Sequence, residues 1–287
     1  MQFLRSRWSL LLLAFIAIGL LTGGFWWWKH SSENPTASEN PTAVESLRAR
    51  KTEGHIALGN PSNANAQDEN NYLLIRKQYI LSYNNTKRIP NWVSWKLVAS
   101  DIGTVPRRND FSADETLPKG WFRVKSSDYA GSGYDRGHMC PAADRSATVE
   151  DNAATFILSN IIPQARDNNQ GPWAKLEDYA RDQVKLGKEA YIMSGGYGQK
   201  AVLPKGKVTV PARTWKVIVF AERGSQGAAS VTQKSQVIAV DLPNEEGIKT
   251  DRWETYRTTI RELESKTGYN FLSNVPQEIQ DQVEVQK

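Results

Sequence analysis

The segment from Tyr134 to Arg145 reads YDRGHMCPAADR and holds a histidine with an arginine on each side. An imidazole can take a proton from water near neutral pH, and arginine stabilises the negative charge that builds on phosphoryl oxygens. His138 is the histidine of the predicted globular body, because His30 borders an apolar run and His55 falls in a polar stretch. These residues indicate acid–base chemistry on a phosphate ester, whereas a single histidine in a turn often has only a structural role.

Amide side chains form a second group, in the segments 160–164 and 167–173. Asn160 lies beside an apolar strand, and Asn169 stands where a helix is predicted to begin. Helix capping is one explanation for asparagine at such a position. An amide oxygen is also a hard ligand that suits Mg²⁺ or Mn²⁺, ions that keep several waters and take few protein ligands. The residues alone leave both interpretations open.

Charged residues complete the candidate set. Glu177 and Arg181 are four residues apart on a predicted helix and therefore share a face, either as an ordinary ion pair or as a water ligand and a phosphate clamp. Arg107 belongs to a short basic stretch in a predicted loop. The body offers one histidine and one cysteine, Cys140, which argues against a zinc site. Cys140 is expected to be a small buried hydrophobe and not a nucleophile.

Three regions are predicted along the 287 residues. Residues 1–30 combine two arginines with an uncharged apolar run of 21 residues, which predicts a membrane anchor or, alternatively, a cleaved signal peptide. Positive charge before the run favours a body outside the cytoplasm. Residues 31–65 are rich in Ser, Asn and Pro and predict a disordered linker, and residues 66–287 form the predicted catalytic domain.

The fold class predicted for the body is α+β, because strand patterns outnumber helix patterns and do not alternate with them. Helices are expected at 172–186 and 253–265. Strands are expected at 72–75, 79–83, 92–97, 191–193, 208–210, 215–220 and 237–240. The chain carries a formal charge of +5, of which +3 falls on the body. A mildly basic body is compatible with a polyanionic substrate but does not require one.

Taken in order, the motifs resemble those of the DNA/RNA non-specific endonuclease family. The resemblance extends from about residue 79 to residue 274 and rests on Asp135-Arg136-Gly137-His138, Asn160, Pro163-Gln164, Asn169-Gln170, Trp173, Leu176-Glu177 and Arg181. It implies a ββα-metal core with a larger antiparallel or mixed sheet and flanking helices. It also implies an endonuclease without sequence or sugar preference, with one Mg²⁺ or Mn²⁺ ion per active site and products that end in 5′-phosphates.

The same resemblance implies roles for individual residues. His138 matches the general base, and Asn169 matches the single direct protein ligand of the metal ion. Glu177 matches the residue that holds the metal's waters. Arg107 matches the arginine that stabilises the transition state, and Asn160 matches a supporting active-site asparagine.

Further matches concern the substrate and the turn. Arg136 and Arg181 match arginines that face the substrate or its phosphate, and Asp135 is expected to orient the turn. Met139 and Cys140 depart from the family pattern, but both are apolar, so the expected chemistry is unchanged. The long N-terminal segment leaves release from the membrane open.

Two other functions use the same residues. A non-catalytic nucleic-acid-binding module would use the arginines alone, and a phosphodiesterase for small molecules or lipids would use the same base. The expected partners are DNA and RNA, and the membrane through the N-terminal segment. The preference for DNA or RNA, the oligomeric state and the existence of a protein inhibitor are not encoded in these motifs.

Overall fold

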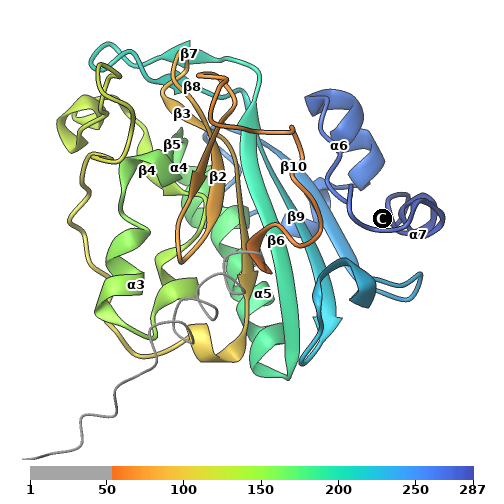
Figure 1. Ribbon diagram of the computed structural model, residues 1–287. Helices are drawn as coiled ribbons and strands as arrows, with labels where there is room; N and C mark the ends of the chain where they lie inside the picture. The colour runs from red at the N-terminus through yellow and green to blue at the C-terminus, as the bar shows by residue number, and fades with distance from the viewer. Residues whose placement is uncertain (1–53) are drawn as a thin grey trace, which may run out of the picture. The chain divides into compact units, whose positions relative to one another are not determined.

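A computed structural model describes residues 54–287 of the chain (Figure 1). The predicted anchor or signal at 1–30 and residues 31–53 of the predicted linker lie outside the described residues. Within the described part, no helix is both long and apolar enough to cross a bilayer.

The folded domain begins earlier than the sequence predicted. Residues 54–65 were expected to be linker, yet Leu58 and Ala64 belong to the hydrophobic core and His55 is buried. The two His55 ring nitrogens bond to the backbone of Lys77 and Lys96. The linker boundary at residue 65 was therefore wrong, because a few apolar side chains in a polar stretch suffice to dock it on the sheet.

A seven-stranded sheet with the order β1-β2-β3-β6-β9-β10-β11 forms the centre of the domain, and every neighbouring pair is antiparallel. Its strands are β1 (Tyr72–Ile75), β2 (Ile80–Asn84), β3 (Ile89–Leu97), β6 (Lys188–Tyr197), β9 (Arg213–Glu222), β10 (Val237–Pro243) and β11 (Arg257–Thr258). A small hairpin pairs β7 (Ala201–Val202) with β8 (Thr209–Val210). Each strand predicted from apolar runs is present, most of them longer than predicted.

The sheet is buried on both faces, which explains why its strands read as continuous apolar runs and not as alternating ones. In β9, Trp215 and Val217 point to one hydrophobic cluster, whereas Ile218 and Phe220 point to the other. Lys216 shares the face of Ile218, because side chains alternate along a strand. A lysine thus lies within the core on the side that carries the candidate site.

The C-terminal helices α6 (Ile260–Thr267) and α7 (Gln277–Val283) cover the face opposite that site (Figure 1). The predicted helix at 253–265 was only half right, since residues 253–256 form a 3₁₀ turn and the following two residues form β11. Thr259 begins α6 with a capping box, in which its side chain accepts from the Glu262 N–H. That cap fixes the helix start and keeps the preceding residues out of it.

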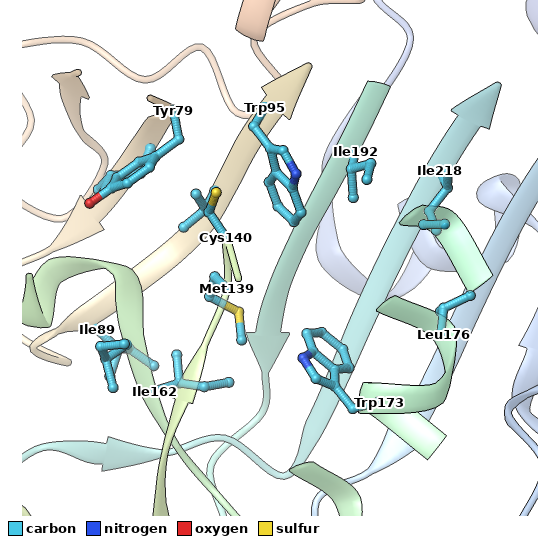
Figure 2. Close-up of a cluster of buried hydrophobic side chains, with 14 of the residues drawn as sticks. Tyr79, Ile89, Trp95, Met139, Cys140, Ile162, Trp173, Leu176, Ile192 and Ile218 are labelled. Carbon is cyan, nitrogen blue, oxygen red and sulfur yellow. The ribbon is translucent and has the colours of Figure 1, made fainter. Parts of the chain in front are cut away.

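The other face carries an antiparallel hairpin of β4 (Asp135–His138) and β5 (Ile161–Gln164), joined by a connection that includes α3 (Val149–Ala154). After β5 come the short α4 (Arg166–Asn168), a π-helical turn (Asn169–Trp173) and α5 (Ala174–Lys185). Figure 2 shows apolar side chains of this unit, such as Met139, Trp173 and Leu176, packed toward Ile192 and Ile218 of the sheet. The hairpin and the following helix confirm the predicted α+β fold with a ββα core.

Candidate active site

A cleft of about 580 Å³ opens where the end of β4 meets the start of α5. Five predicted site residues line it: Arg107, His138, Asn169, Glu177 and Arg181. The other lining residues are Gly103, Thr104, Val105, Pro141, Ala142, Ala143, Ser146, Asn152, Gln170 and Ala174. Hairpin, helix and the loop at 103–107 thus bring together residues that are up to 78 positions apart in the sequence.

His138 ends β4, and its ring packs against two aromatic side chains that also contact each other. The ring centroid lies 5.4 Å from that of Phe111 and 4.8 Å from that of Phe156. Its buried Nε2 has no hydrogen-bond partner among the described residues. Burial, together with the nearby Arg107 and Arg136, lowers the pKa of His138 from 6.5 to about 3. The imidazole is therefore neutral at physiological pH and retains a lone pair that can accept a proton.

Asn169 opens the π-helical turn, and Asp135 of the hairpin fixes the orientation of its amide. The Asn169 Nδ2 donates to Asp135 Oδ2 at 3.0 Å, and Gln170 Nε2 donates to the same oxygen at 2.8 Å. The Asn169 Oδ1 accepts no hydrogen bond from the described residues. Because Asp135 binds the amide nitrogen, the carbonyl oxygen of Asn169 is left free to bind a cation.

Glu177 lies one turn into α5, and a buried lysine holds its carboxylate. Lys216 Nζ lies 3.1 Å from Glu177 Oε1 and 4.0 Å from the centre of the Trp173 ring. Lys216 is 1% exposed and does not line the cleft. Burial raises the pKa of Glu177, and the ammonium of Lys216 opposes that rise. Lys216 therefore holds the carboxylate from behind while Glu177 faces the cleft.

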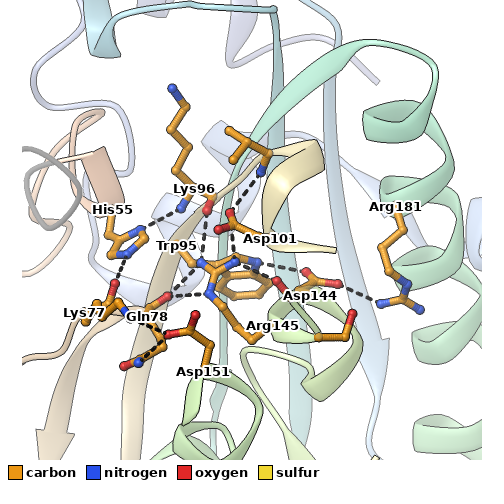
Figure 3. A network of polar contacts seen from close by, with 12 residues as sticks. His55, Lys77, Gln78, Trp95, Lys96, Asp101, Asp144, Arg145, Asp151 and Arg181 are labelled. Atoms are coloured by element: carbon orange, nitrogen blue, oxygen red, sulfur yellow. Dashed lines mark hydrogen bonds and ion pairs between the residues drawn. The ribbon is translucent and has the colours of Figure 1, made fainter. Parts of the chain in front are cut away.

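Arg181 lies one turn beyond Glu177 and is fixed by two carboxylates. Its Nη1 is 2.8 Å from Asp144 Oδ1, and its Nη2 is 2.5 Å from Asp178 Oδ1. Asp144 is itself buried and accepts from Trp95 Nε1 at 2.9 Å (Figure 3). Burial alone would lower the pKa of Arg181, but Asp144 and Glu177 together raise it. The guanidinium is thus a permanently charged group held at the cleft.

Asn160 does not line the cleft. It is fully buried, its Oδ1 accepts from the Cys140 N–H, and its Nδ2 donates to the carbonyls of Cys140 and Thr155. These bonds brace the backbone just after His138. The structure therefore places Asn160 where it supports the histidine and does not place it in contact with a substrate.

The two remaining arginines lie around the histidine. Arg107 is exposed and lines the cleft, with its guanidinium carbon 6.0 Å from the centre of the Phe156 ring. Arg136 lies 4.4 Å above the Phe111 ring and bonds to Ser126, outside the cleft lining. Both guanidinium groups lie near aromatic rings that also contact His138, so they place positive charge close to the imidazole.

Three structural partners of the site were not identified as such from the sequence: Lys216, Asp144 and the Phe111–Phe156 pair. Lys216 could have been recognised from the sequence, because it is the single charged residue in the apolar run from Trp215 to Phe220. The contact of Phe111 and Phe156 with His138 could not have been recognised, since the two residues come from separate loops that only the fold brings to His138.

The donor set of the cleft fits a hard divalent cation held mainly through water. Across residues 54–287 there is no group of three or more His, Cys, Asp or Glu side chains that could enclose a metal ion. The free Asn169 oxygen and the Glu177 carboxylate are both oxygen donors that line the cleft. Mg²⁺ keeps several waters and commonly uses few protein ligands, so this sparse set suits it.

A hairpin that carries an unpaired base, followed by a helix that carries an amide and a carboxylate, defines the class of ββα-metal nucleases. The chain belongs to the DNA/RNA non-specific endonuclease family, whose model matches residues 58–278. The match begins before residue 66, in agreement with the earlier start of the folded domain. The chain is therefore a nuclease and hence a hydrolase.

Individual relatives support this assignment. A nuclease of Nostoc sp. is 49% identical over 232 residues, which cover 80% of this chain and 84% of that protein. The human mitochondrial nuclease EXOG is 32% identical over 211 residues, which cover 69% of this chain and 56% of that protein. A solved structure of an EndoG/EndoGI complex has a TM-score of 0.67 at 24% identity and covers 80% of this chain and 94% of that chain, so it shares the fold.

Proposed function

We propose that the chain is a metal-dependent endonuclease that hydrolyses internal phosphodiester bonds of both DNA and RNA and leaves 5′-phosphate ends. One observation carries the proposal: His138 Nε2 and Asn169 Oδ1, which have no hydrogen-bond partner within residues 54–287, belong to residues that line one cleft. A base and a cation ligand in one cleft provide the two groups that phosphodiester hydrolysis needs.

Each of these cleft residues has a distinct role in the proposed reaction. His138 accepts the proton of the attacking water, and its low pKa keeps the imidazole unprotonated across the neutral range. One Mg²⁺ or Mn²⁺ ion on Asn169, when bound, supplies positive charge to the phosphoryl oxygens. Glu177 accepts hydrogen bonds from water in the cleft, and Arg181 and Arg107 stabilise the negative charge of the transition state.

Recognition through phosphates explains why the expected activity has no sequence preference. Phosphate contacts position a nucleic acid but carry no sequence information. The cleft lining contains arginines and small side chains, and apart from His138 it contains no aromatic residue that could stack on a base. Cleavage of both DNA and RNA follows, because both polymers present the same phosphodiester group.

The location of the activity is a further part of the proposal. We infer from the sequence of residues 1–30 that the nuclease domain acts outside the cytoplasm, either tethered to the membrane or released from it. Mass spectrometry of the mature N-terminus distinguishes the two forms. A mature protein that begins at Met1 and remains in the cytoplasm would contradict this part.

A digestion assay tests the proposed activity directly. The full-length chain is incubated with supercoiled plasmid and with RNA, in Mg²⁺, in Mn²⁺ and in a chelator. We expect nicked and then linear plasmid, degraded RNA, ends that ligate without prior phosphorylation, and no cleavage in chelator. Binding without cleavage at saturating metal would instead identify a non-catalytic binding module.

A further inference from the structure

Three chain segments form a strongly basic surface on the domain: residues 87–88, 119–128 and 205–207. They contain seven basic residues and one acidic residue. The five lysines, which are all exposed and form no ion pair with the described residues, are Lys87, Lys119, Lys125, Lys205 and Lys207. We refer to these three segments as the basic surface.

Side-chain and backbone contacts show that the three segments adjoin one another. The Arg88 guanidinium donates to the Gly206 carbonyl and lies 4.1 Å above the Phe122 ring. The Lys87 carbonyl accepts from the Thr209 N–H at 2.9 Å. A methyl group added at Gly206 would lie 2.6 Å from the Asp128 Cβ. Figure 1 shows the corresponding place, where β7 and β8 meet the ends of β2 and β3.

The charge of the domain is concentrated at this surface. Residues 54–287 carry 30 basic and 27 acidic residues, a net charge of +3. The three segments carry a net +6, or +5 when Glu115, which pairs with Arg123 at 3.2 Å, is counted with them, so the rest of the domain has a net charge of −3 or −2. A field of this kind attracts polyanions to one region of an otherwise acidic domain.

Backbone conformation provides a second, independent observation. Three non-glycine residues of the described chain have positive φ, and two of them, Arg88 (61°) and Lys207 (50°), belong to the basic surface. The left-handed region disfavours residues with a Cβ, and glycine or asparagine would fit these turns better. Long cationic side chains at strained turn positions suggest a functional role, because strain of this kind concentrates at binding sites.

A chain of side-chain contacts leads from the basic surface to His138 in the cleft. Ser126, within the second segment, bonds to Arg136 of β4, and Arg136 lies over the Phe111 ring that contacts His138. Phe122 is 39% exposed amid the cations. Cations combined with an exposed aromatic ring are typical of surfaces that follow a nucleic-acid strand.

We propose that the basic surface is an extended binding site for the phosphate backbone of nucleic acid, which holds the polymer on one side of the scissile bond. The inference rests on the proposed nuclease function and adds a binding region outside the cleft. It makes cleavage of long polymers more efficient than cleavage of a single diester, because only a polymer reaches both sites. Each phosphate contact also contributes to the salt dependence of binding.

The test compares the full-length protein with the variant Lys87→Gln/Lys205→Gln/Lys207→Asn. Asparagine is used at 207 because it tolerates positive φ. We expect a KM for long DNA that is roughly 10- to 100-fold higher, and a slope of log binding constant against log salt that is smaller by about 0.9 for each lost contact with duplex DNA. Binding is measured in chelator so that no cleavage occurs, and turnover of a small chromogenic diester should stay unchanged.

A matched control separates local binding from bulk charge. Lys185, Arg223 and Lys234 are exposed residues at the other end of the sheet. Lys185 is the last residue of α5 and lies 3.3 Å from Asp182, Arg223 follows β9, and Lys234 precedes β10. Their replacement by glutamine removes the same three charges and should leave the KM for DNA and the salt slope close to those of the wild type. Equal changes in the two triple variants, or none in either, would overturn the inference.

Stability gives an additional readout. Lys207→Asn alone should leave the melting temperature equal or higher while it weakens DNA binding, since it relieves an unfavourable backbone conformation. Loss of stability with unchanged binding would mean that Lys207 has only a structural role. If the wild type cleaves neither the polymer nor the diester, the proposed function fails. If it cleaves both, but the two triple variants have the same salt slope, only the inference fails.

Discussion

Lys216 is the residue that most clearly links the core of the domain to its chemistry. It is buried under the cleft between the Trp173 ring and the Glu177 carboxylate. Moving an ammonium group out of water costs free energy unless the group is paired with an opposite charge. Among residues 54–287 the Lys216 ammonium donates a hydrogen bond to Glu177 alone, which lines the cleft, so the fold depends on Lys216 and Glu177 remaining together.

Replacement of Lys216 by methionine should therefore affect both stability and activity. The change leaves the half-buried Glu177 carboxylate without its ion-pair partner, which costs up to about 3–5 kcal/mol of unfolding free energy. The double variant Lys216→Met/Glu177→Gln should recover most of that stability but no activity. Urea denaturation and plasmid cleavage measure the two effects. If the single variant proved as stable as wild type, the ion pair would not hold Glu177.

The buried imidazole of His138 predicts a characteristic pH dependence. Its pKa is about 3 in the folded protein and near 6.5 when unfolded, so the unfolded chain binds more protons between these values. His138 therefore does not change the free energy of unfolding above pH 6.5. It lowers that free energy as the pH falls from 6.5 toward 3. Urea denaturation from pH 7 to pH 4 should show a smaller loss for His138→Asn than for wild type. Parallel curves would contradict the low pKa.

For individual residues, the sequence predicted which side chains face the cleft better than it predicted which contacts hold them. Five of its seven candidates line the cleft, because their order along the chain resembles a known motif. Asn160 turned out to brace the Cys140 backbone, and Arg136 bonds to Ser126. These contacts depend on how loops distant in sequence pack together, which a linear pattern does not encode.

Among the elements, the hairpin and the π-helical turn depend on one carboxylate. Asp135 of β4 holds the amides of Asn169 and Gln170 in the turn and lies 3.6 Å from the guanidinium of Arg166. Gly171 allows the turn to approach residue 249 closely, since a methyl group there would lie 2.7 Å from the Lys249 backbone. The metal-binding oxygen is thus aimed by contacts between elements.

Asp135→Ala should release the Asn169 amide without unfolding the hairpin. We expect the Mg²⁺ concentration for half-maximal cleavage to rise by about 10- to 100-fold, the usual effect of losing a partner of a metal ligand. Cleavage at saturating Mg²⁺ should fall much less. Arg166→Ala is the matched control, because its 3.6 Å pair is largely exposed. An unchanged Mg²⁺ requirement in Asp135→Ala would show that Asp135 does not orient the ligand.

The apolar patterns identified the central strands and α5 but misplaced other elements. The residues of α6 carry a capping box that begins the helix at 260, whereas the periodicity alone extended it back to 253. The strand β4 was not found by its pattern, because Asp-Arg-Gly-His has no apolar alternation and becomes a strand only by pairing with β5. Pairing partners 23 to 29 residues apart override local preference in such a hairpin.

For the molecule as a whole, the N-terminal residues of the folded domain are part of its core. Leu58 is 1% exposed, and the Ala57 carbonyl and the Leu58 carbonyl both accept bonds from Asn274 near the C-terminus. The segment therefore ties the two ends of the domain together over the face of the sheet opposite the cleft.

Truncation should reveal this dependence. A protein that starts at residue 54, the first residue that the structure describes, should fold and cleave DNA like the full-length chain. A protein that starts at residue 66 loses Leu58 and Ala64 from the core, which should cost several kcal/mol, since one buried leucine contributes about 2–5 kcal/mol. Thermal unfolding of the two proteins checks this, and equal melting temperatures would contradict a core role for residues 54–65.

The central claim is that His138 acts as the general base beside a cation held by Asn169. Its most direct test is the turnover number of His138→Ala on duplex DNA at saturating Mg²⁺, in the full-length protein, with the circular dichroism spectrum and Mn²⁺ affinity measured in parallel. We predict a loss of about 10²- to 10⁴-fold in turnover with an unchanged spectrum and unchanged Mn²⁺ binding. A folded, metal-binding variant that retains nearly full turnover would contradict the account.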